Sequence, residues 1–402
     1  MRLVIIGGGV AGVTVARLVA EADPSAEVVI YSAEELPYYP RPRLIEFLAG
    51  RLALERLPLY PREWYEERGI RLELGQRAAA LDLAAQRVRL ADGREVPYDH
   101  LVLAMGAHSW VPPIGGVERE GVYTLRTVED AQAIRRDAQA AKRVVVLGGG
   151  LLGLDTSGAL RALGVEVLVI EAQPWLLPRQ LDREGAAVLE AILQRMGIQV
   201  ITGELCTQME GRGQVERLRL KSGRTLEAEM VVISAGVRSN IALAKEAGLA
   251  CNRGIVVDEH LQTSHPQVYA VGDVAEFAGR VWAIIPAAIA QGRALGAWLS
   301  GQDGRYEGIV PSATLKVSGV DLASIGEVNP EGEGFEELRR AEPERGLYRK
   351  LVLREGRIVG AILLGDRSEF AAVSRLISQG VDVSAYGEKL LEDGALAELA
   401  RG

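Results

Sequence analysis

The stretch Leu3-Val4-Ile5-Ile6-Gly7-Gly8-Gly9-Val10-Ala11-Gly12 places a short apolar run directly before a glycine-rich loop. The same pattern returns later as Val144-Val145-Val146-Leu147-Gly148-Gly149-Gly150-Leu151-Leu152-Gly153. Both loops fit G-x-G-x-x-G, and each lies between a predicted strand and a predicted helix. One such loop is weak evidence. Two in the same context predict an α/β fold with two Rossmann-like dinucleotide-binding domains.

Each glycine of these loops has its own expected role. The first (Gly7 and Gly148) allows a tight turn, and the third (Gly12 and Gly153) lets the helix pack closely on the strand. The second lets the backbone approach a pyrophosphate, so we expect Gly9 and Gly150 there. The helix N-terminus then offers N–H groups and a partial positive charge to the phosphates. These N–H groups belong to Val10, Ala11, Leu151 and Leu152. The alternative is a pair of ordinary strand–helix turns.

An acidic residue follows the second loop at the position that a ribose would need. The predicted strand Val165-Glu166-Val167-Leu168-Val169-Ile170 ends in Glu171. A carboxylate there accepts hydrogen bonds from the adenosine ribose, and it would repel the 2′-phosphate of NADP. The next residues, Ala172-Gln173-Pro174, supply no arginine. We therefore predict NADH over NADPH, against the alternative of a solvated charge at a strand end.

The first loop departs from this pattern. Its second strand, Val28-Val29-Ile30-Tyr31, ends in Ser32, and the nearest acids, Glu34 and Glu35, come two and three places later. A serine hydroxyl makes a weaker hydrogen bond with a ribose than a carboxylate does. We keep Ser32 as the candidate at this position, with Glu34 as a less favoured one.

Composition bounds the class of protein. The chain has 402 residues, of which 48% are hydrophobic and 25% charged, which is typical of a globular protein with more than one domain. The net charge of −8 argues against a nucleic-acid or membrane-surface binder. No apolar segment is long enough to cross a membrane, and the first strand begins at Arg2-Leu3, where a signal peptide would otherwise lie. We expect a cytoplasmic protein.

The metal and thiol ligands are too few for a cluster. The only cysteines, Cys206 and Cys251, are not in a metal or redox spacing, so we predict no metal and no iron–sulfur centre. The four histidines are scattered, and we interpret them as structural or surface residues. They are His100, His108, His260 and His265.

Strands and helices alternate along the chain in two similar halves and a different final part. We predict one domain from residues 1–110 and 238–308, a second from 111–237, and a small C-terminal α+β domain over 309–402. The return to the first domain is indicated by the strand Val268-Tyr269-Ala270-Val271-Gly272-Asp273 and by a helix from about Ala287, with Pro286 at its start. The final part contains a predicted hairpin between Tyr348 and Leu364.

The order of motifs resembles a known family over nearly the whole chain. It runs G-x-G-x-x-G, Ala104-Met105-Gly106-Ala107, G-x-G-x-x-G, Ala235-Gly236-Val237-Arg238 and Tyr269-Ala270-Val271-Gly272-Asp273-Val274-Ala275. This resembles the FAD-dependent pyridine nucleotide–disulfide oxidoreductases. Within them it is most similar to NADH:rubredoxin reductases and to the flavin part of assimilatory NADH nitrite reductases. Supporting stretches are Tyr38-Tyr39-Pro40-Arg41-Pro42-Arg43-Leu44, Arg179-Gln180-Leu181-Asp182-Arg183, Arg253-Gly254-Ile255-Val256-Val257-Asp258 and Leu315-Lys316-Val317-Ser318-Gly319.

The resemblance implies FAD on the first domain and NADH on the second. It implies that Asp273 hydrogen-bonds the ribityl chain, with Gly272 allowing close approach, and that Arg41 and Arg43 neutralise the pyrophosphate or flank the flavin. It further places Ala78, Met105 and Gly106 beside FAD, and Asp155 and Gly236 beside NADH. Asp155 is shorter than the family's usual glutamate, and Met105 stands where threonine is common.

Hydride transfer from NADH to flavin N5 needs no side-chain acid or base, because the cofactors carry the chemistry. The positive end of the helix at Pro286-Ala287 would stabilise charge at N1 and C2=O of the flavin. The resemblance also places Lys316 near the flavin ring, as a candidate catalytic residue acting through its charge. The alternative is a surface lysine.

The family's redox thiols are missing from this chain. Disulfide reductases carry a cysteine pair after the first βαβ unit, and related enzymes carry one cysteine, whereas this chain has Pro42-Arg43-Leu44-Ile45-Glu46-Phe47-Leu48. The C-terminal His-Glu pair is also missing, since no histidine follows His265. We therefore expect electrons to leave the flavin directly, to a docked rubredoxin or, second, a ferredoxin.

Two other functional hypotheses are compatible with the sequence. The chain could be an NADH oxidase or a quinone-type reductase, or it could be a flavin component or redox-sensing subunit of a larger complex. It carries no siroheme or iron–sulfur motif, so we expect it not to be a complete nitrite reductase. The resemblance allows a monomer or a homodimer.

Overall fold

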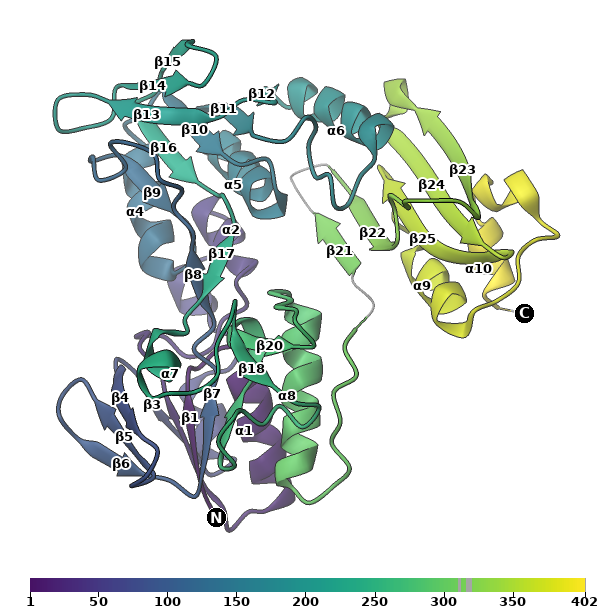
Figure 1. Ribbon diagram of the computed structural model, residues 1–402. Coiled ribbons are helices and arrows are strands. Elements are labelled where there is room, and N and C mark those ends of the chain that lie inside the picture. The colour runs from purple at the N-terminus through teal and green to yellow at the C-terminus, as the bar shows by residue number, and fades with distance from the viewer. Residues whose placement is uncertain (310–311, 316–319, 402) are drawn as a thin grey trace. The chain divides into compact units, whose positions relative to one another are not determined.

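The computed structural model describes residues 1–309, 312–315 and 320–401, and the chain forms two compact units (Figure 1). The first unit consists of Met1–Phe47, Leu52–Trp110 and Gly236–Ile309. The second consists of Leu48–Arg51, Val111–Ala235 and the described part of Val310–Gly402. Lys316 lies outside the described residues.

A five-stranded parallel sheet forms the centre of the first unit. Its strand order is β19-β7-β1-β2-β3, so the last strand in sequence pairs with β7 at one edge. The strands are short, and apart from β3 each has only one polar residue at most, at its first position, which is typical of parallel strands covered on both faces. Their bounds are β1 Arg2–Ile6, β2 Glu27–Tyr31, β3 Ile70–Glu73, β7 His100–Leu103 and β19 Val268–Ala270.

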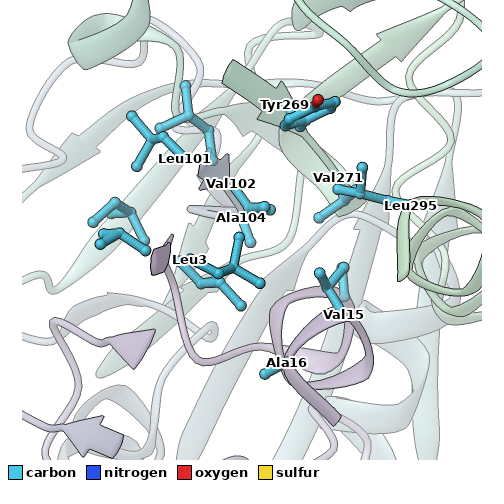
Figure 2. Packing of buried hydrophobic residues seen from close by; sticks show 14 of the residues in the cluster. Leu3, Val15, Ala16, Leu101, Val102, Ala104, Tyr269, Val271 and Leu295 are labelled. Carbon is cyan, nitrogen blue, oxygen red and sulfur yellow. The ribbon is translucent and has the colours of Figure 1, made fainter. Parts of the chain in front are cut away.

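Two helices pack on each other beside this sheet. They are α1 (Val10–Ala22) and α8 (Ile285–Leu299). A Cβ atom on Gly292 would come within 2.9 Å of the Thr14 Cβ, and one on Gly296 within 2.8 Å of the Leu18 Cβ, so the two glycines allow the helices to approach closely. Figure 2 shows Val15 of α1 and Leu295 of α8 in the apolar core with Leu3, Leu101, Val102 and Val271.

Smaller elements complete the first unit. The antiparallel strands β4, β5 and β6 form one small sheet, and β8 pairs with β17 and β18 with β20. The bounds are α2 Arg43–Leu48, η1 Leu54–Arg56, α3 Arg62–Glu66, β4 Ala78–Asp82, β5 Arg87–Leu90, β6 Glu95–Pro97, β8 Ala107–Ser109, β17 Val237–Ser239, α7 Ala242–Glu246, β18 Ile255–Val257, η2 Gly272–Val274 and β20 Ala275–Phe277.

A second parallel sheet lies in the second unit, with the order β12-β11-β10-β16-β9. The strands have the same arrangement as in the first sheet. A three-stranded antiparallel sheet, β13-β14-β15, precedes β16 along the chain, as β4-β5-β6 precedes β7 in the first unit. The bounds are β9 Val122–Thr124, α4 Val128–Ala138, β10 Arg143–Leu147, α5 Leu151–Ala162, β11 Glu166–Glu171, α6 Arg183–Arg195, β12 Ile198–Thr202, β13 Cys206–Glu210, β14 Arg217–Leu220, β15 Thr225–Glu227 and β16 Met230–Ile233.

The C-terminal domain is built on an antiparallel sheet of order β21-β22-β25-β24-β23. Leu351 and Leu363 of this sheet form an apolar cluster with Val373 and Leu376 of α9. The bounds are β21 Ser312–Leu315, β22 Leu322–Gly326, β23 Phe335–Glu342, η3 Pro343–Arg345, β24 Leu347–Arg354, β25 Arg357–Leu364, α9 Phe370–Gln379, η4 Gly387–Leu391 and α10 Ala395–Leu399.

The predicted fold class is confirmed, because the chain has two parallel Rossmann-like sheets and a separate C-terminal antiparallel sheet. One detail differs. Helix α8 begins at Ile285, two residues before the expected Ala287, while Pro286 lies in its first turn, at the start of the helix as expected. Proline is tolerated there because the first N–H groups of a helix have no partner within it.

Candidate functional site

The two glycine loops have the same backbone geometry. Gly7 and Gly148 adopt φ of +116° and +117°, in a region that favours glycine. A Cβ on either residue would collide with a backbone carbonyl oxygen, that of Ala104 for Gly7 and that of Ser234 for Gly148. Both positions therefore require glycine.

The third glycine of each loop also has no room for a side chain. A Cβ on Gly12 would strike the carbonyl oxygen of Gly7, and one on Gly153 would strike that of Gly148. The helix thus begins in direct contact with the turn before it. A backbone cannot retreat as a flexible side chain can, so both positions are closed to larger residues.

The middle glycine of each loop is open instead. Gly9 and Gly150 are the N-caps of α1 and α5, with extended backbone (φ −78° and −75°), and a Cβ on either would meet nothing within 4 Å. Neither helix has a side-chain cap or an acidic residue in its first turn. An uncapped helix N-terminus beside open space fits an anionic phosphate. Each loop therefore fits the pyrophosphate of a dinucleotide.

Glu171 is held at the second loop by two backbone hydrogen bonds. The Gly149 N–H donates to its Oε2 at 2.6 Å, and the Gln173 N–H donates to its Oε1 at 2.7 Å. The residue is 9% exposed. The alternative of a solvated charge is therefore wrong, because Glu171 lies buried against the loop.

Ser32 lies at the matching place in the first unit but makes a weaker contact. It is buried, and its Oγ accepts from the Glu34 N–H at 3.3 Å. A Cβ on Gly8 would come within 3.3 Å of this Oγ, so Ser32 lies beside the first loop as Glu171 lies beside the second.

The two arginines after β2 are already engaged with the protein. Arg41 forms an ion pair with Glu34 and donates to the Tyr39 hydroxyl at 2.5 Å. Partial burial works against its charge, but the Glu34 carboxylate holds the pKa of Arg41 above its usual value. Arg43 donates from Nη1 to three backbone carbonyls, the nearest being that of Leu57 at 3.2 Å. A pyrophosphate would have to share these guanidinium groups with their present partners.

The segment Gly272-Asp273 lies at the N-terminal end of α1. Gly272 has φ of +81°, and a Cβ on it would come within 3.1 Å of the Ala11 Cβ. The Asp273 carbonyl accepts from the Ser239 hydroxyl at 2.7 Å. Folding thus brings this late segment to the start of α1, in the same unit as the first loop.

The remaining predicted residues lie within helices or strands or directly beside them. Met105 and Gly106 follow β7, and Gly106 has φ of +64°. Gly236 has φ of +104° and accepts from the Trp110 N–H through its carbonyl. Ala78 begins β4, Asp155 lies in α5, and Pro286 and Ala287 lie in the first turn of α8.

Two polar residues near these segments were missed from the sequence. Gln291, 1% exposed in α8, accepts from the Gly272 N–H through Oε1 at 2.7 Å. Asn240 donates from Nδ2 to the Met105 carbonyl at 2.8 Å, and its Oδ1 lies 2.7 Å from His108 Nδ1. A glutamine inside a helix of small apolar residues was a usable signal for Gln291. Asn240 lies in a loop and carried none.

Burial disfavours the thiolate form of both cysteines. Both cysteines are free, and burial raises the pKa of Cys206 to about 11 and that of Cys251 above its usual value. Among the described residues, no cluster of histidine, cysteine and acidic side chains could hold a metal ion. In the same part of the chain, no helix is long and apolar enough to span a bilayer.

Comparison with known proteins identifies the family. Residues 1–292 match the pyridine nucleotide-disulphide oxidoreductase family, and residues 311–381 match the rubredoxin NAD+ reductase C-terminal domain. The chain belongs to the pyridine nucleotide-disulphide oxidoreductases. The family is FAD-dependent and uses pyridine nucleotides. The resemblance inferred from the motifs is confirmed.

The relatives include nitrite reductases and ferredoxin reductases. The chain is 35% identical over 385 residues to a nitrite reductase [NAD(P)H] of Bacillus subtilis, covering 95% of this chain and 48% of that protein. It is 32% identical over 400 residues to the biphenyl dioxygenase system ferredoxin–NAD(+) reductase component of Paraburkholderia xenovorans, covering 98% and 96%. The chain spans about half the length of the nitrite and nitrate reductase relatives that it matches.

A solved structure shows the same fold over the full length. The reductase of the covalent putidaredoxin reductase–putidaredoxin complex superposes with a TM-score of 0.88 at 27% identity, covering 100% of this chain and 99% of that one. The C-terminal antiparallel domain is therefore part of a shared architecture.

Proposed function

We propose that this protein is an NADH-dependent FAD reductase that delivers electrons to a small redox carrier, a rubredoxin or a ferredoxin. One observation carries the proposal. Two glycine loops of the same geometry each present an uncapped helix N-terminus beside open space, at Gly9 and at Gly150. An enzyme that joins two dinucleotides needs two such cradles.

The chain's own part is binding and orientation. When bound, the two cofactors supply the redox chemistry, a hydride passing from nicotinamide to flavin. The N–H groups at the start of α1 and of α5 receive the two pyrophosphates. Asp273 and Gly272 meet the ribityl chain of FAD, and the first turn of α8, with Pro286 and Ala287, directs its positive end to the flavin. Ser32, Ala78, Met105 and Gly106 line the same cofactor, and Arg41 and Arg43 share their guanidinium groups with it.

The choice of NADH rests on Glu171. Its two oxygens are fixed by the Gly149 and Gln173 N–H groups, and a carboxylate has further lone pairs to accept the two ribose hydroxyls. A 2′-phosphate would bring two more negative charges against this buried carboxylate. Asp155 and Gly236 stay proposed contacts toward the nicotinamide end, and Lys316 stays a proposed electrostatic contact of the flavin.

The state of the two thiols bears on the route by which electrons leave the flavin. With its pKa near 11, Cys206 is a protonated thiol at neutral pH, and Cys251 is shifted in the same direction. A thiolate is the species that would carry electrons through a disulfide, so a thiol relay is unfavourable here. Direct transfer from the flavin to the acceptor is the remaining route, and relatives named for ferredoxin and putidaredoxin support a small redox carrier as that acceptor.

A second candidate function has its own support. The chain spans about half of the nitrite and nitrate reductase relatives, so it could act as the flavin component of a nitrite-reducing system. Its acceptor would then be another subunit in place of a free carrier. Direct reduction of oxygen or of a quinone is a third acceptor class.

Anaerobic stopped-flow spectroscopy tests the proposal. The purified yellow protein is mixed with NADH, then with oxidised rubredoxin, ferredoxin or oxygen in separate experiments. We expect rapid bleaching of the flavin absorbance and rapid reoxidation by one of the two carriers. Bleaching with reoxidation by oxygen alone would favour an oxidase. Bleaching without reoxidation by any of these would favour the flavin component. No bleaching by NADH or NADPH would contradict the proposal.

A further inference from the structure

The loop 172–182 connects Glu171 to the N-cap of α6, Asp182. It has a defined conformation, because Leu176, Leu177 and Leu181 are all buried. Leu177 adopts φ of +53°, which is unusual for a side chain of its size, and its carbonyl accepts from the Gln180 and Leu181 N–H groups at 2.8 Å each. A conformation of this kind persists only when its surroundings hold it.

One side of the loop lies against the proposed NADH site. Leu176 packs onto Gly149, since a Cβ atom added to Gly149 would lie 2.5 Å from the Leu176 Cδ2. The Gln173 N–H donates to the Glu171 carboxylate at 2.7 Å. The loop thus contacts both the phosphate cradle and the proposed ribose acceptor.

The other side of the loop is held by the C-terminal domain. Asn329 follows β22, and its Nδ2 donates to the backbone carbonyls of Pro178 and Leu181, both at 3.0 Å. A side-chain amide nitrogen has two N–H donors, so both donors of Asn329 are used in hydrogen bonds to the loop. These two hydrogen bonds join segments that are far apart in the sequence.

Asp182 anchors the end of the loop to the same domain. Its Oδ1 caps α6 through the Gly185 N–H at 2.9 Å. Its Oδ2 accepts from the Tyr348 hydroxyl at 2.7 Å and lies 3.2 Å from the Nζ of Lys350. A Cβ on Gly185 would come within 2.9 Å of the Tyr348 ring, so this glycine lets the ring lie against α6.

Lys350 is buried with two carboxylates. Only 2% of its side chain is exposed, and its Nζ lies 3.1 Å from Oε1 of Glu337 and 3.2 Å from Asp182. A buried ion pair adds little net stability compared with apolar packing, but it costs much when one partner is lost, so it favours one arrangement over others. The cluster therefore sets the position of the loop's end.

We propose that the C-terminal domain positions the adenosine side of the NADH site through the loop 172–182, with Asn329 and Lys350 as positioning residues. The inference rests on the proposed function, because it takes Glu171 and Gly149 as the nucleotide contacts. A shift of the loop would move Leu176 and the Gln173 N–H, which support those two residues. The C-terminal domain would then contribute to nucleotide affinity without touching the nucleotide.

Two variants of the holoenzyme test this. Asn329→Asp keeps the shape but removes both donors, and Lys350→Met removes the buried cation. We expect each to weaken binding of NADH and of 5′-AMP by about 3- to 10-fold, the range of one or two lost hydrogen bonds. The limiting rate of flavin bleaching at saturating NADH should stay within about twofold of wild type. The reason is that the loop is proposed to act on the adenosine side of NADH and not on its nicotinamide ring. Anaerobic stopped-flow gives the NADH values, and calorimetry gives the AMP affinity.

Arg349→Met is the matched control. Arg349 neighbours Lys350 on β24 and is also buried, but it pairs with Glu369 at 2.9 Å and bonds the Glu392 carbonyl, away from the loop. We expect it to lower the melting temperature as Lys350→Met does, with unchanged affinity for AMP.

Wild-type affinity for NADH and AMP in Asn329→Asp and Lys350→Met would overturn this inference but not the proposed function. So would an equal loss of affinity in Arg349→Met, since general destabilisation would then explain the effect. A wild-type protein that binds neither AMP nor NADH would overturn the proposed function, and this inference with it.

Discussion

Gly149 donates its backbone N–H to Oε2 of Glu171 at 2.6 Å, across the turn that joins the second sheet to α5. The second oxygen of the same carboxylate accepts from the Gln173 N–H at 2.7 Å. Both oxygens are thus held in place for the ribose hydroxyls that we propose they accept. Less freedom has to be lost on binding when the contacting group is already held.

Replacing Glu171 by Gln should weaken NADH binding. Hydrogen bonds to a charged group contribute about 1.5–3 kcal/mol, so we expect the KM for NADH to rise roughly 10-fold or more. The preference for NADH over NADPH should fall, because the repulsion of the 2′-phosphate is lost. Steady-state kinetics with both nucleotides measures this.

Glu166→Gln supplies the matched control. Glu166 begins the same strand, and its side chain is 69% exposed beside Arg143. It should keep the wild-type KM and the wild-type preference. An unchanged nucleotide preference in Glu171→Gln would contradict the assignment of Glu171.

Alanine at the middle and third glycines should separate binding from folding. Gly150→Ala fits the backbone and meets no atom within 4 Å, so the melting temperature should change by less than about 4 °C. NADH binding should nevertheless weaken more than about 10-fold, because the methyl group enters the space assigned to the pyrophosphate. Gly153→Ala strikes a carbonyl and should cost about 1–3 kcal/mol of stability. Equal behaviour of the two variants in thermal melts would argue against this geometry.

Gln291→Leu should disturb the first unit at Gly272. The substitution leaves the Gly272 N–H without its 2.7 Å partner in a buried place, at a cost of about 1–3 kcal/mol. We expect a lower urea midpoint and a lower FAD content per purified chain. Gln302→Leu, at an exposed position after α8, should match wild type in both measurements.

The thiols should be dispensable. A Cys206→Ala, Cys251→Ser double variant should reduce the carrier at the wild-type rate, because neither thiol is favoured as a thiolate at neutral pH. Iodoacetamide should likewise leave the wild-type enzyme active at pH 7. A large loss of carrier reduction in a folded, FAD-loaded double variant would mean that a thiol lies on the electron route.

The contact of the C-terminal domain with α6 should weaken in acid. Burial opposes the charge of Asp182, but hydrogen bonds from Tyr348 and Gly185 and the charge of Lys350 together hold its pKa below the usual value. A depressed carboxylate pKa stabilises the fold fully above the unfolded value, near 3.9, and loses that contribution as pH falls through the folded value. Urea midpoints between pH 7 and pH 3 should therefore fall less steeply in Asp182→Asn than in wild type. Parallel curves would show that this carboxylate does not contribute.

Local patterns predicted much of this fold. The two G-x-G-x-x-G loops, the strands before them and the hairpin between Tyr348 and Leu364 depend on residues adjacent in sequence, and the structure has each of them. The position of Glu171 at the end of strand β11 was predictable for the same reason, while its contact with a ribose stays a prediction. Short-range sterics and hydrogen bonding dominate such features.

Long-range contacts were decided by the tertiary structure alone. Gly272 meets Ala11 and Gln291 bonds Gly272 only because the folded chain brings these groups together. The bond from Asn329 to the carbonyls of Pro178 and Leu181 is the clearest case. Neither residue type nor spacing marks a surface asparagine as a support for a distant loop. Two glycine motifs were enough to specify two strand–loop–helix turns of the same geometry, since each turn is local. The packing that supports their rims depends on side chains from distant segments, whose meeting no local pattern records.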